Sequence, residues 1–345
     1  MTRNALLLFL LVGVLGFLLP ACAFQSAPDT EDRTEVLRWP VAPYPPRIEW
    51  VKDIRAPEDH GIDKGFFKRI SESISGVRSK PINKPYGVHA DAKRRLIVAD
   101  PGTAVVHLFD TERNSYQALR GGKGTPFRAP IGVTEDHLGN LYVTDSGAGT
   151  IYRYNIKERS YSDFPSRQLE RPTGIVYSRR HEMLFVSETL AHQIVAFDLQ
   201  GAELFRIGQR GGGDVQFNYP TDLFIDSKGQ LYVTDALNQR IQILTPEGQL
   251  VGKFGEGGDT TGYFAKPKGV AVDAQGHIYV CDALLDAVQV FDSSGRLLMY
   301  FGGTGSDRGE FWMPTGIFID AENYIYVADS FNRRIQVFRY VGKED

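Results

Sequence analysis

The chain has 345 residues, with 39 Lys and Arg side chains against 42 Asp and Glu, and a mean hydropathy of −0.25. Without residues 1–21, which contain one basic residue and no acid, 38 basic groups face 42 acidic groups, a net charge of −4. This balance lacks the basic excess that nucleic-acid binding needs, and the single long apolar run excludes a membrane protein with many spans. The length allows one large domain or two ordinary ones.

The N-terminal residues predict export. Arg3 precedes an apolar run from Ala5 to Leu19, which is typical of a secretory signal. A membrane-spanning anchor is the alternative, although the run is short for a span. Leu19-Pro20-Ala21-Cys22 resembles the bacterial lipobox, with an unusual proline. The resemblance implies that residues 1–21 are removed as a lipoprotein signal peptide. It also implies that Cys22 carries lipid anchoring the protein to a membrane of the bacterial cell envelope. Ala23 after the cysteine favours the outer membrane.

The next segment is expected to connect this anchor to a folded domain. Residues 22–47 are rich in Pro, Asp, Glu, Ser and Thr, as in a tether. Ile48–Ile54 alternates apolar and polar residues, which predicts a strand. Residues 64–75 carry apolar side chains at helical spacing and predict a short helix packed on the domain. An interfacial membrane helix is the alternative for this segment.

A unit of 42 to 48 residues then recurs six times. Its opening is Pro-x-Gly, which occurs at Pro85, Pro130, Pro172, Pro267 and Pro314, with Pro220-Thr-Asp222 as the variant. Its second strand is expected to end on an acid, namely Asp100, Asp145, Glu188, Asp235, Asp282 or Asp329. A fixed period of this length with four strands in each copy is typical of a β-propeller with one repeat per blade.

The fifth copy shows the predicted strands most clearly. They cover residues 269–273, 278–281, 288–291 and 296–300, and Gly, Asp or Ser residues bound them. The predicted fold is all-β: a six-bladed propeller of four-stranded antiparallel blades, within a single domain of residues 48–345. The sixth copy ends after its third strand, at Tyr340. We therefore expect Ile48–Ile54 to supply the outer strand of the last blade and to close the ring.

Two copies resemble the NHL repeat. The resemblance is carried by Asp235-Ala-Leu-Asn-Gln-Arg-Ile-Gln-Ile-Leu244, by Asp329-Ser-Phe-Asn-Arg-Arg-Ile-Gln-Val-Phe338, and by the Gly-Gly-x-Gly…Phe-x-x-Pro linker from Gly302 to Pro314. It extends over residues 81–340 and implies the propeller fold. NHL propellers serve as RNA binders, as protein-interaction modules and, more rarely, as enzymes, so the resemblance does not select one function.

The expected propeller has two unlike faces. Tight turns follow Asp91, Asp136, Asp226, Asp273 and Asp320, while longer loops and Gly-rich linkers lie at the opposite end of each blade. Binding sites concentrate on longer loops, so the long-loop face is the candidate binding face. Residues that depart from the repeat are the candidate site residues there: Asp222, Lys268, Glu188, His192, Gln239, Asp286 and Arg333. A solvated rim without function is the alternative for any one of them.

Residues that recur in every copy are expected to be structural instead. The repeated acids are predicted to accept backbone hydrogen bonds within their own loops. Arg240 and Arg334 are predicted to form local ion pairs with the acids that precede them. Cys281 occupies a position where other copies have Ala, Ser or Thr, which predicts a small buried core residue rather than a nucleophile.

Motifs for catalysis and metal binding are missing from the sequence. The seven His residues form no HxH or HxxxH pair, and no Gly-x-Ser-x-Gly or phosphate-binding loop occurs. We therefore predict a binding or scaffold module without a cofactor, whose long-loop face binds an envelope protein or polysaccharide rather than nucleic acid. The alternative is a lyase or hydrolase with one divalent metal ion at the channel mouth, near Asp222.

Overall fold

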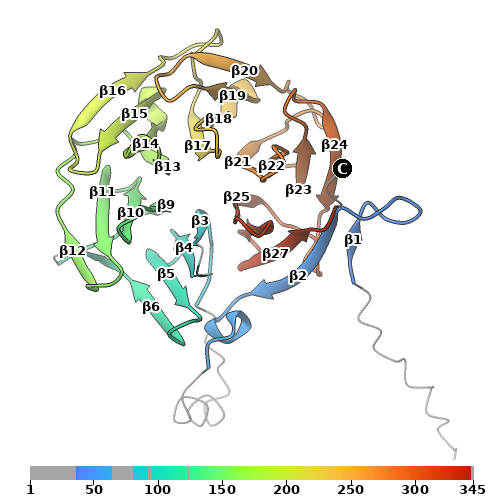
Figure 1. Cartoon of the computed structure of the whole chain (residues 1–345), viewed down its shortest axis with the longest axis horizontal. Coiled ribbons are helices and arrows are strands. Elements are labelled where there is room, and N and C mark those ends of the chain that lie inside the picture. Colours follow the sequence, from blue (N-terminus) through green and yellow to red (C-terminus); the bar gives the residue numbers. More distant parts are fainter. Residues whose placement is uncertain (1–35, 64–80, 92, 94, 123, 343–345) are drawn as a thin grey trace, which may run out of the picture. The chain divides into compact units, whose positions relative to one another are not determined.

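The computed structural model describes residues 36–342 except 64–80, 92, 94 and 123. Over these residues six sheets surround a central axis, which confirms the six-bladed β-propeller (Figure 1). The predicted signal peptide, Cys22 and the predicted helix at 64–75 lie outside the described residues. No helix in the described part of the chain is long and apolar enough to cross a membrane.

Each of the first five blades is a four-stranded antiparallel meander, with its first strand nearest the axis. Blade 1 contains β3 (Val88–Ala90), β4 (Leu96–Asp100), β5 (Val105–Asp110) and β6 (Ser115–Leu119). Blade 2 contains β9 (Pro130–Glu135), β10 (Asn140–Asp145), β11 (Thr150–Asn155) and β12 (Ser160–Ser162). Blade 3 contains β13 (Pro172–Ser178), β14 (Met183–Glu188), β15 (Gln193–Asp198) and β16 (Glu203–Ile207).

Blades 4 and 5 follow the same plan. Blade 4 contains β17 (Pro220–Ile225), β18 (Leu231–Asp235), β19 (Arg240–Leu244) and β20 (Leu250–Phe254). Blade 5 contains β21 (Pro267–Val272), β22 (Ile278–Asp282), β23 (Ala287–Phe291) and β24 (Leu297–Gly302). Short elements occupy the connections: β7 (Gly121–Gly122), β8 (Thr125–Pro126), and the 3₁₀ turns η1 (Pro57–His60), η2 (Thr189–Ala191) and η3 (Ala236–Asn238).

The two ends of the domain meet in blade 6, as the strand count predicts. Strand β2 (Ile48–Ile54) pairs antiparallel with β27 (Arg334–Tyr340), outside β26 (Tyr324–Asp329) and β25 (Pro314–Ile319). Figure 1 shows β2 and β27 side by side although they come from opposite ends of the chain. Strand β1 (Arg38–Trp39) adds a fifth strand to this blade, and it comes from within the segment predicted as a tether.

The core is divided among the spaces between neighbouring blades. One cluster joins Tyr232 and Ile241 of blade 4 to Val270 and Ile278 of blade 5, all 6 % exposed or less. A Phe of the linker, Phe264, is fully buried in the same cluster. Each blade thus buries one face against the next, so closing the ring removes apolar surface from water.

Glycines of the Pro-x-Gly openings allow the inner strands to approach one another. A Cβ atom on Gly87 would overlap the carbonyl oxygen of Ile131 in the next blade, and one on Gly132 would overlap the carbonyl oxygen of Thr173. Neither glycine needs a left-handed backbone, so the requirement is close approach alone. The glycine of the repeated Pro-x-Gly opening thus serves the close packing of neighbouring inner strands.

Candidate functional site

The register of each blade separates two faces. Pro220, at the start of β17, pairs with Asp235, at the end of β18, so the linker and the loop lie at the same end of the blade. The backbone N–H of Leu237 in that loop donates to Asn218 of the linker at 3.0 Å. The tight turn at Asp226 lies at the opposite end of both strands. We name these ends the loop face and the turn face.

The repeated acids hold the loop face together. Asp235 accepts hydrogen bonds from Arg240 Nε and Asn238 Nδ2, each at 2.8 Å, and from the backbone N–H of Asn218 at 2.6 Å. Arg240 also donates to the linker carbonyl oxygens of Gly212 and Gly213. The Asp-x-x-Asn-x-Arg signature is therefore a clamp between loop and linker, and the predicted local ion pair is confirmed.

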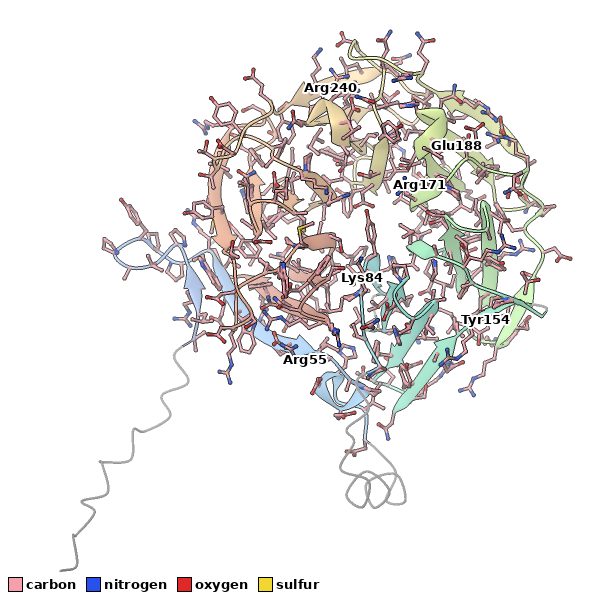
Figure 2. The ribbon with its side chains drawn as sticks, turned by 180° about the vertical axis from the view of Figure 1, so that it is seen from behind. Arg55, Lys84, Tyr154, Arg171, Glu188 and Arg240 are labelled. Carbon is pink, nitrogen blue, oxygen red and sulfur yellow. The ribbon has the colours of Figure 1, made fainter. Side chains whose placement is uncertain are left out.

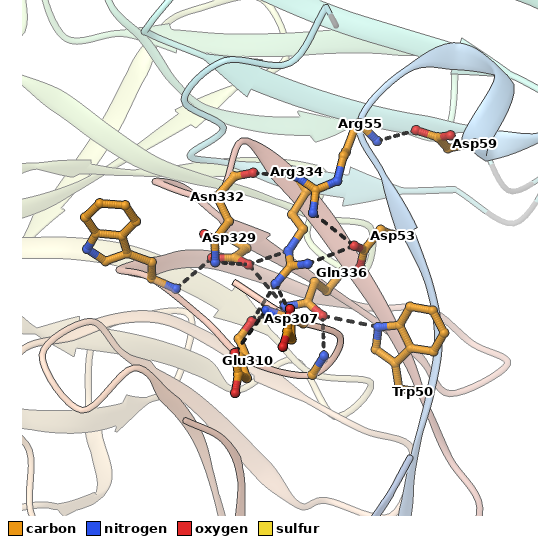
Figure 3. Close-up of polar contacts among 12 residues, drawn as sticks. Trp50, Asp53, Arg55, Asp59, Asp307, Glu310, Asp329, Asn332, Arg334 and Gln336 are labelled. Carbon is orange, nitrogen blue, oxygen red and sulfur yellow. Dashed lines mark hydrogen bonds and ion pairs between the residues drawn. The ribbon is translucent and has the colours of Figure 1, made fainter. Parts of the chain in front are cut away.

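Blade 6 has the same clamp with an added connection to the N-terminal strand. Arg334 Nε donates to Asp329 at 2.6 Å, and its NH1 donates to Asp53 of β2 at 2.8 Å (Figure 3). Its NH2 donates to the carbonyl oxygens of Asp307 and Glu310 at 2.7 Å. The Arg334 side chain is 1 % exposed. One buried guanidinium thus joins loop, linker and closing strand.

Three of the candidate site residues are occupied by similar internal contacts. Glu188 is fully buried and pairs with Arg167 and with Arg206, the latter at 3.5 Å. His192 Nδ1 accepts from the backbone N–H of Tyr219 at 3.2 Å, and Asp286 accepts from the backbone N–H of Met313 at 2.7 Å. His192 and Asp286 are 7 % and 8 % exposed. Their departures from the repeat thus supply alternative clamps between loop and linker.

The remaining four candidates occupy different surroundings. Gln239 is half-buried and lies over Gly257 of a neighbouring linker, whereas Arg333 is exposed on the loop face. Asp222 and Lys268 line the central channel together. The structure therefore brings only Asp222 and Lys268 of the seven into one cavity.

The central channel is a cavity of about 240 Å³ between the inner strands. Asp222 Oδ2 accepts from the backbone N–H of Val270 at 3.1 Å, so this side chain also joins blades 4 and 5. The Asp222 side chain is half-buried, and burial raises the pKa of its carboxyl group to about 7. The pKa of Lys268 is lowered by burial and by the positive charges of Lys266 and Arg171.

Exposed cations surround the loop-face mouth of this channel. The two residues before each of the six prolines include four cations and one acid, Glu170, in a chain whose net charge is −3. These cations are Lys84, Arg128, Arg171 and Lys266, all exposed and none in an ion pair with a described residue. Figure 2 shows Lys84 and Arg171 close to the centre of the ring, while Arg240 lies farther out.

Apolar side chains project from the same face at one repeated position. The second residue after the loop acid is Gly in blades 1 and 2 and a large apolar residue in the other four, namely Leu190, Leu237, Leu284 and Phe331. Leu237 is 61 % exposed and Leu284 is 60 % exposed. Phe331 lies 5.5 Å from the ring of Trp312, which is 53 % exposed, and 4.9 Å from Lys84 Nζ. We name these four apolar side chains, together with Trp312, the apolar arc.

Sequence reasoning missed this arc, although one signal for it was available. Leu190, Leu237, Leu284 and Phe331 align when the copies are superposed on their loop acids. Glu188, His192 and Asp286, which depart from the repeat, are instead residues that the fold uses internally. Cys281 is confirmed as a core residue, since it is fully buried and burial raises the pKa of its thiol well above the usual range.

A metal site does not emerge from the described side chains. Within residues 36–342, apart from the gaps named above, no three His, Cys, Asp or Glu side chains are grouped so that they could hold a metal ion. At the position of Asp222 the other five inner strands carry Gly, so a single carboxylate faces the channel at this level.

The geometry thus defines a six-bladed β-propeller with a narrow channel and a basic, partly apolar mouth. Comparisons with known sequences agree: residues 217–244 match the NHL repeat, and residues 266–343 match a family described as a 6-bladed beta-propeller. The NHL resemblance is therefore confirmed. A comparison with curated proteins found no match.

Solved structures share the fold at low sequence identity. An auxiliary nutrient binding protein from Bacteroides thetaiotaomicron is 16 % identical, with a TM-score of 0.58 over 76 % of this chain and 70 % of that one. Virginiamycin B lyase from Staphylococcus aureus is 16 % identical, with a TM-score of 0.55 over 75 % of this chain and 96 % of that one. A gluconolactonase from Xanthomonas campestris is 18 % identical, with a TM-score of 0.56 over 75 % and 86 %. These neighbours include both binding proteins and enzymes, and they establish the fold alone.

Proposed function

We propose that this protein is a non-enzymatic binding module whose loop face docks a protein partner in the bacterial cell envelope. The observation that carries the proposal is the joint presence, around one channel mouth, of the apolar arc and of cations that form no ion pair with a described residue. Exposed apolar groups gathered on one face are typical of interaction sites, and Trp, Phe and Arg are enriched there. A binding role also accords with the auxiliary nutrient binding proteins that share the fold.

The proposed partner presents an apolar patch bordered by acidic groups. Apolar side chains would pack on Leu237 and Leu284, while carboxylates would pair with Arg171 and Lys266. Charge complementarity of this kind steers association and excludes other partners. An acidic polysaccharide would satisfy the cations but would leave the three leucines of the arc without apolar contacts, so a protein is the better fit.

We further propose that lipid on Cys22 attaches the protein to the outer membrane, with the following residues as a tether. This proposal depends on the lipobox resemblance at Leu19–Cys22. Attachment would keep the propeller near envelope partners, so that binding takes place at a raised effective concentration.

The test is a comparative pull-down of full-length protein from its native envelope, read by mass spectrometry. The loop-face variant carries Arg171→Glu and Lys266→Glu, and the matched turn-face control carries Arg179→Glu and Lys228→Glu, all exposed cations. We expect an acidic partner protein that the loop-face variant loses and the control retains. A partner that both variants retain, or that only the control loses, would overturn the assignment of the face. Loss of binding at 0.5 M NaCl would support the charge pairing.

A further inference from the structure

The central channel offers a second kind of site, which is independent of partner docking. Its walls are mostly apolar and include Ile131, Val133, Ile175, Leu223, Phe224 and Phe318. Its volume of about 240 Å³ is slightly below that of most sites for drug-sized ligands, so it suits a small molecule. Most of the polar groups that line it lie towards its two ends, and Asp222 lies one residue inward of the Lys268 level.

The end near the loop face carries a cation that forms no ion pair with a described residue; Asp222, which lines the same channel, instead accepts from the backbone N–H of Val270. Lys268 is the only Lys or Arg among the described residues lining the channel, and no described acid forms an ion pair with it. It is the second residue of β21, the position that Thr221 occupies in β17 of the neighbouring blade. The buried hydroxyl of Thr221 makes no hydrogen bond with a described residue. A partly buried ammonium group without a counter-ion is costly, and an anion at this level would relieve that cost.

The end near the turn face carries hydrogen-bonding groups that the fold does not use. Glu135 Oε1 accepts from Arg95 NH2 at 2.8 Å, but the buried Oε2 has no partner among the described residues. The His89 ring lies 4.5 Å from the Phe318 ring, and its nitrogens make no hydrogen bond with a described residue. Burial lowers the pKa of His89 to about 4, and burial raises the pKa of Glu135 to about 7. Neutral imidazole and a carboxyl group thus face the same space.

The separation of the two ends follows from the strand register. Counted from the proline that opens each blade, Lys268 is the second residue when Pro267 is counted as the first, and His89 is the fifth when Pro85 is counted as the first. Three residues of strand span roughly 10 Å. A small molecule with a polar group at each end could therefore bridge the two levels through one hydrogen bond at each end.

We propose that the channel binds a small organic acid with an apolar body, its carboxylate on Lys268 and a terminal hydroxyl on His89 and Glu135. The apolar body would lie between Phe224 and Phe318. A primary amine fits less well, because it would place a second positive charge beside Lys268 or near Arg95. A fully apolar ligand would leave Lys268 and Glu135 Oε2 without partners.

The test uses calorimetry on the full-length chain with three pairs of probes. The acids are 4-hydroxybenzoate, 4-hydroxyphenylacetate and 6-hydroxyhexanoate, and each is compared with its amide. At least one acid is expected to bind at least tenfold more tightly than its amide. Lys268→Met should remove that preference, whereas Lys228→Met, an exposed lysine on the turn face, should leave it unchanged.

Three results would overturn the proposal. They are no binding of any acid, equal binding of each acid and its amide, and a preference that survives in Lys268→Met. If Lys268→Met does not fold, as judged by circular dichroism, the acid-to-amide comparison in the native protein still decides the question. Failure here leaves partner docking untouched, since that test replaces only exposed loop-face cations.

Discussion

Replacing Arg334 with Met should destabilise the propeller strongly, because one side chain joins three parts of blade 6. Arg334 is 1 % exposed, pairs with the fully buried Asp329, and donates to Asp53 and to two linker carbonyl oxygens. Removing one partner of a buried ion pair costs about 3–5 kcal/mol, since the remaining charge stays buried and unpaired. For a domain of this size that loss lowers Tm by roughly 6–15 °C.

The matched control is Arg240→Met in blade 4. Arg240 makes the same contacts with its loop acid and linker, but it has no bond to the N-terminal strand. We expect Arg334→Met to lower the free energy of unfolding by about 1 kcal/mol more than Arg240→Met does, because only Arg334 also bonds to the partly exposed Asp53. Urea unfolding followed by fluorescence would measure both changes.

The pH dependence of this cost gives a second readout. Burial raises the pKa of Asp329, and Arg334 opposes that rise. Without Arg334 the carboxyl group would protonate at a higher pH, so the cost of the substitution should be smallest in acid and should grow as the pH rises. If Arg334→Met lowers the free energy of unfolding by less than about 1 kcal/mol at pH 8, the clamp is not a source of stability.

Four further outcomes follow from the structure. Deleting residues 38–54 removes β1 and β2 and should lower Tm by about 10 °C or more, because blade 6 loses its outer strand. An unchanged Tm would refute ring closure by the N-terminal segment. Gly87→Ala places a Cβ against the Ile131 carbonyl oxygen and should cost about 2–4 kcal/mol in urea unfolding, while Gly212→Ala, which has open space around it, should be nearly neutral. The raised pKa of Asp222 makes the folded state bind more protons between about pH 4 and 7, so the contribution of this group to stability should fall as the pH rises through that range. Asp222→Asn should abolish that part of the slope and be more stable than the native protein by at least about 1 kcal/mol at pH 8; parallel pH profiles would contradict this. Cys22→Ala should move the protein from the membrane fraction to the soluble fraction, and unchanged fractionation would exclude lipid on Cys22 as the anchor.

The fold could be predicted from the sequence because the same pattern of strands and turns occurs in six copies. Each Pro-x-Gly and each loop acid marks the same end of a blade, so errors in a single copy do not change the count. The role of Ile48–Ile54 followed from the missing fourth strand after Tyr340, a deficit that the closed ring has to satisfy. Strand β1 could not be predicted, because two residues carry no periodicity.

The site was less predictable for a physical reason. A residue that departs from the repeat can either face solvent or replace an internal contact, and the sequence does not distinguish the two. Glu188 is clamped by Arg167 and Arg206 from outside its own loop, and His192 accepts a backbone hydrogen bond from the next linker. These partners are distant in the sequence, so only the three-dimensional structure shows that the side chains are occupied.

The central claim, that the loop face is the binding face, can be tested most directly by photo-crosslinking in intact cells. A photoreactive amino acid would replace Leu237 on the loop face or, as the control, Leu138 in the turn after Asp136; the two leucines are 61 % and 62 % exposed. We expect a covalent adduct with an acidic envelope protein from position 237 and none from position 138. Adducts from position 138 alone, or the same adducts from both positions, would contradict the account.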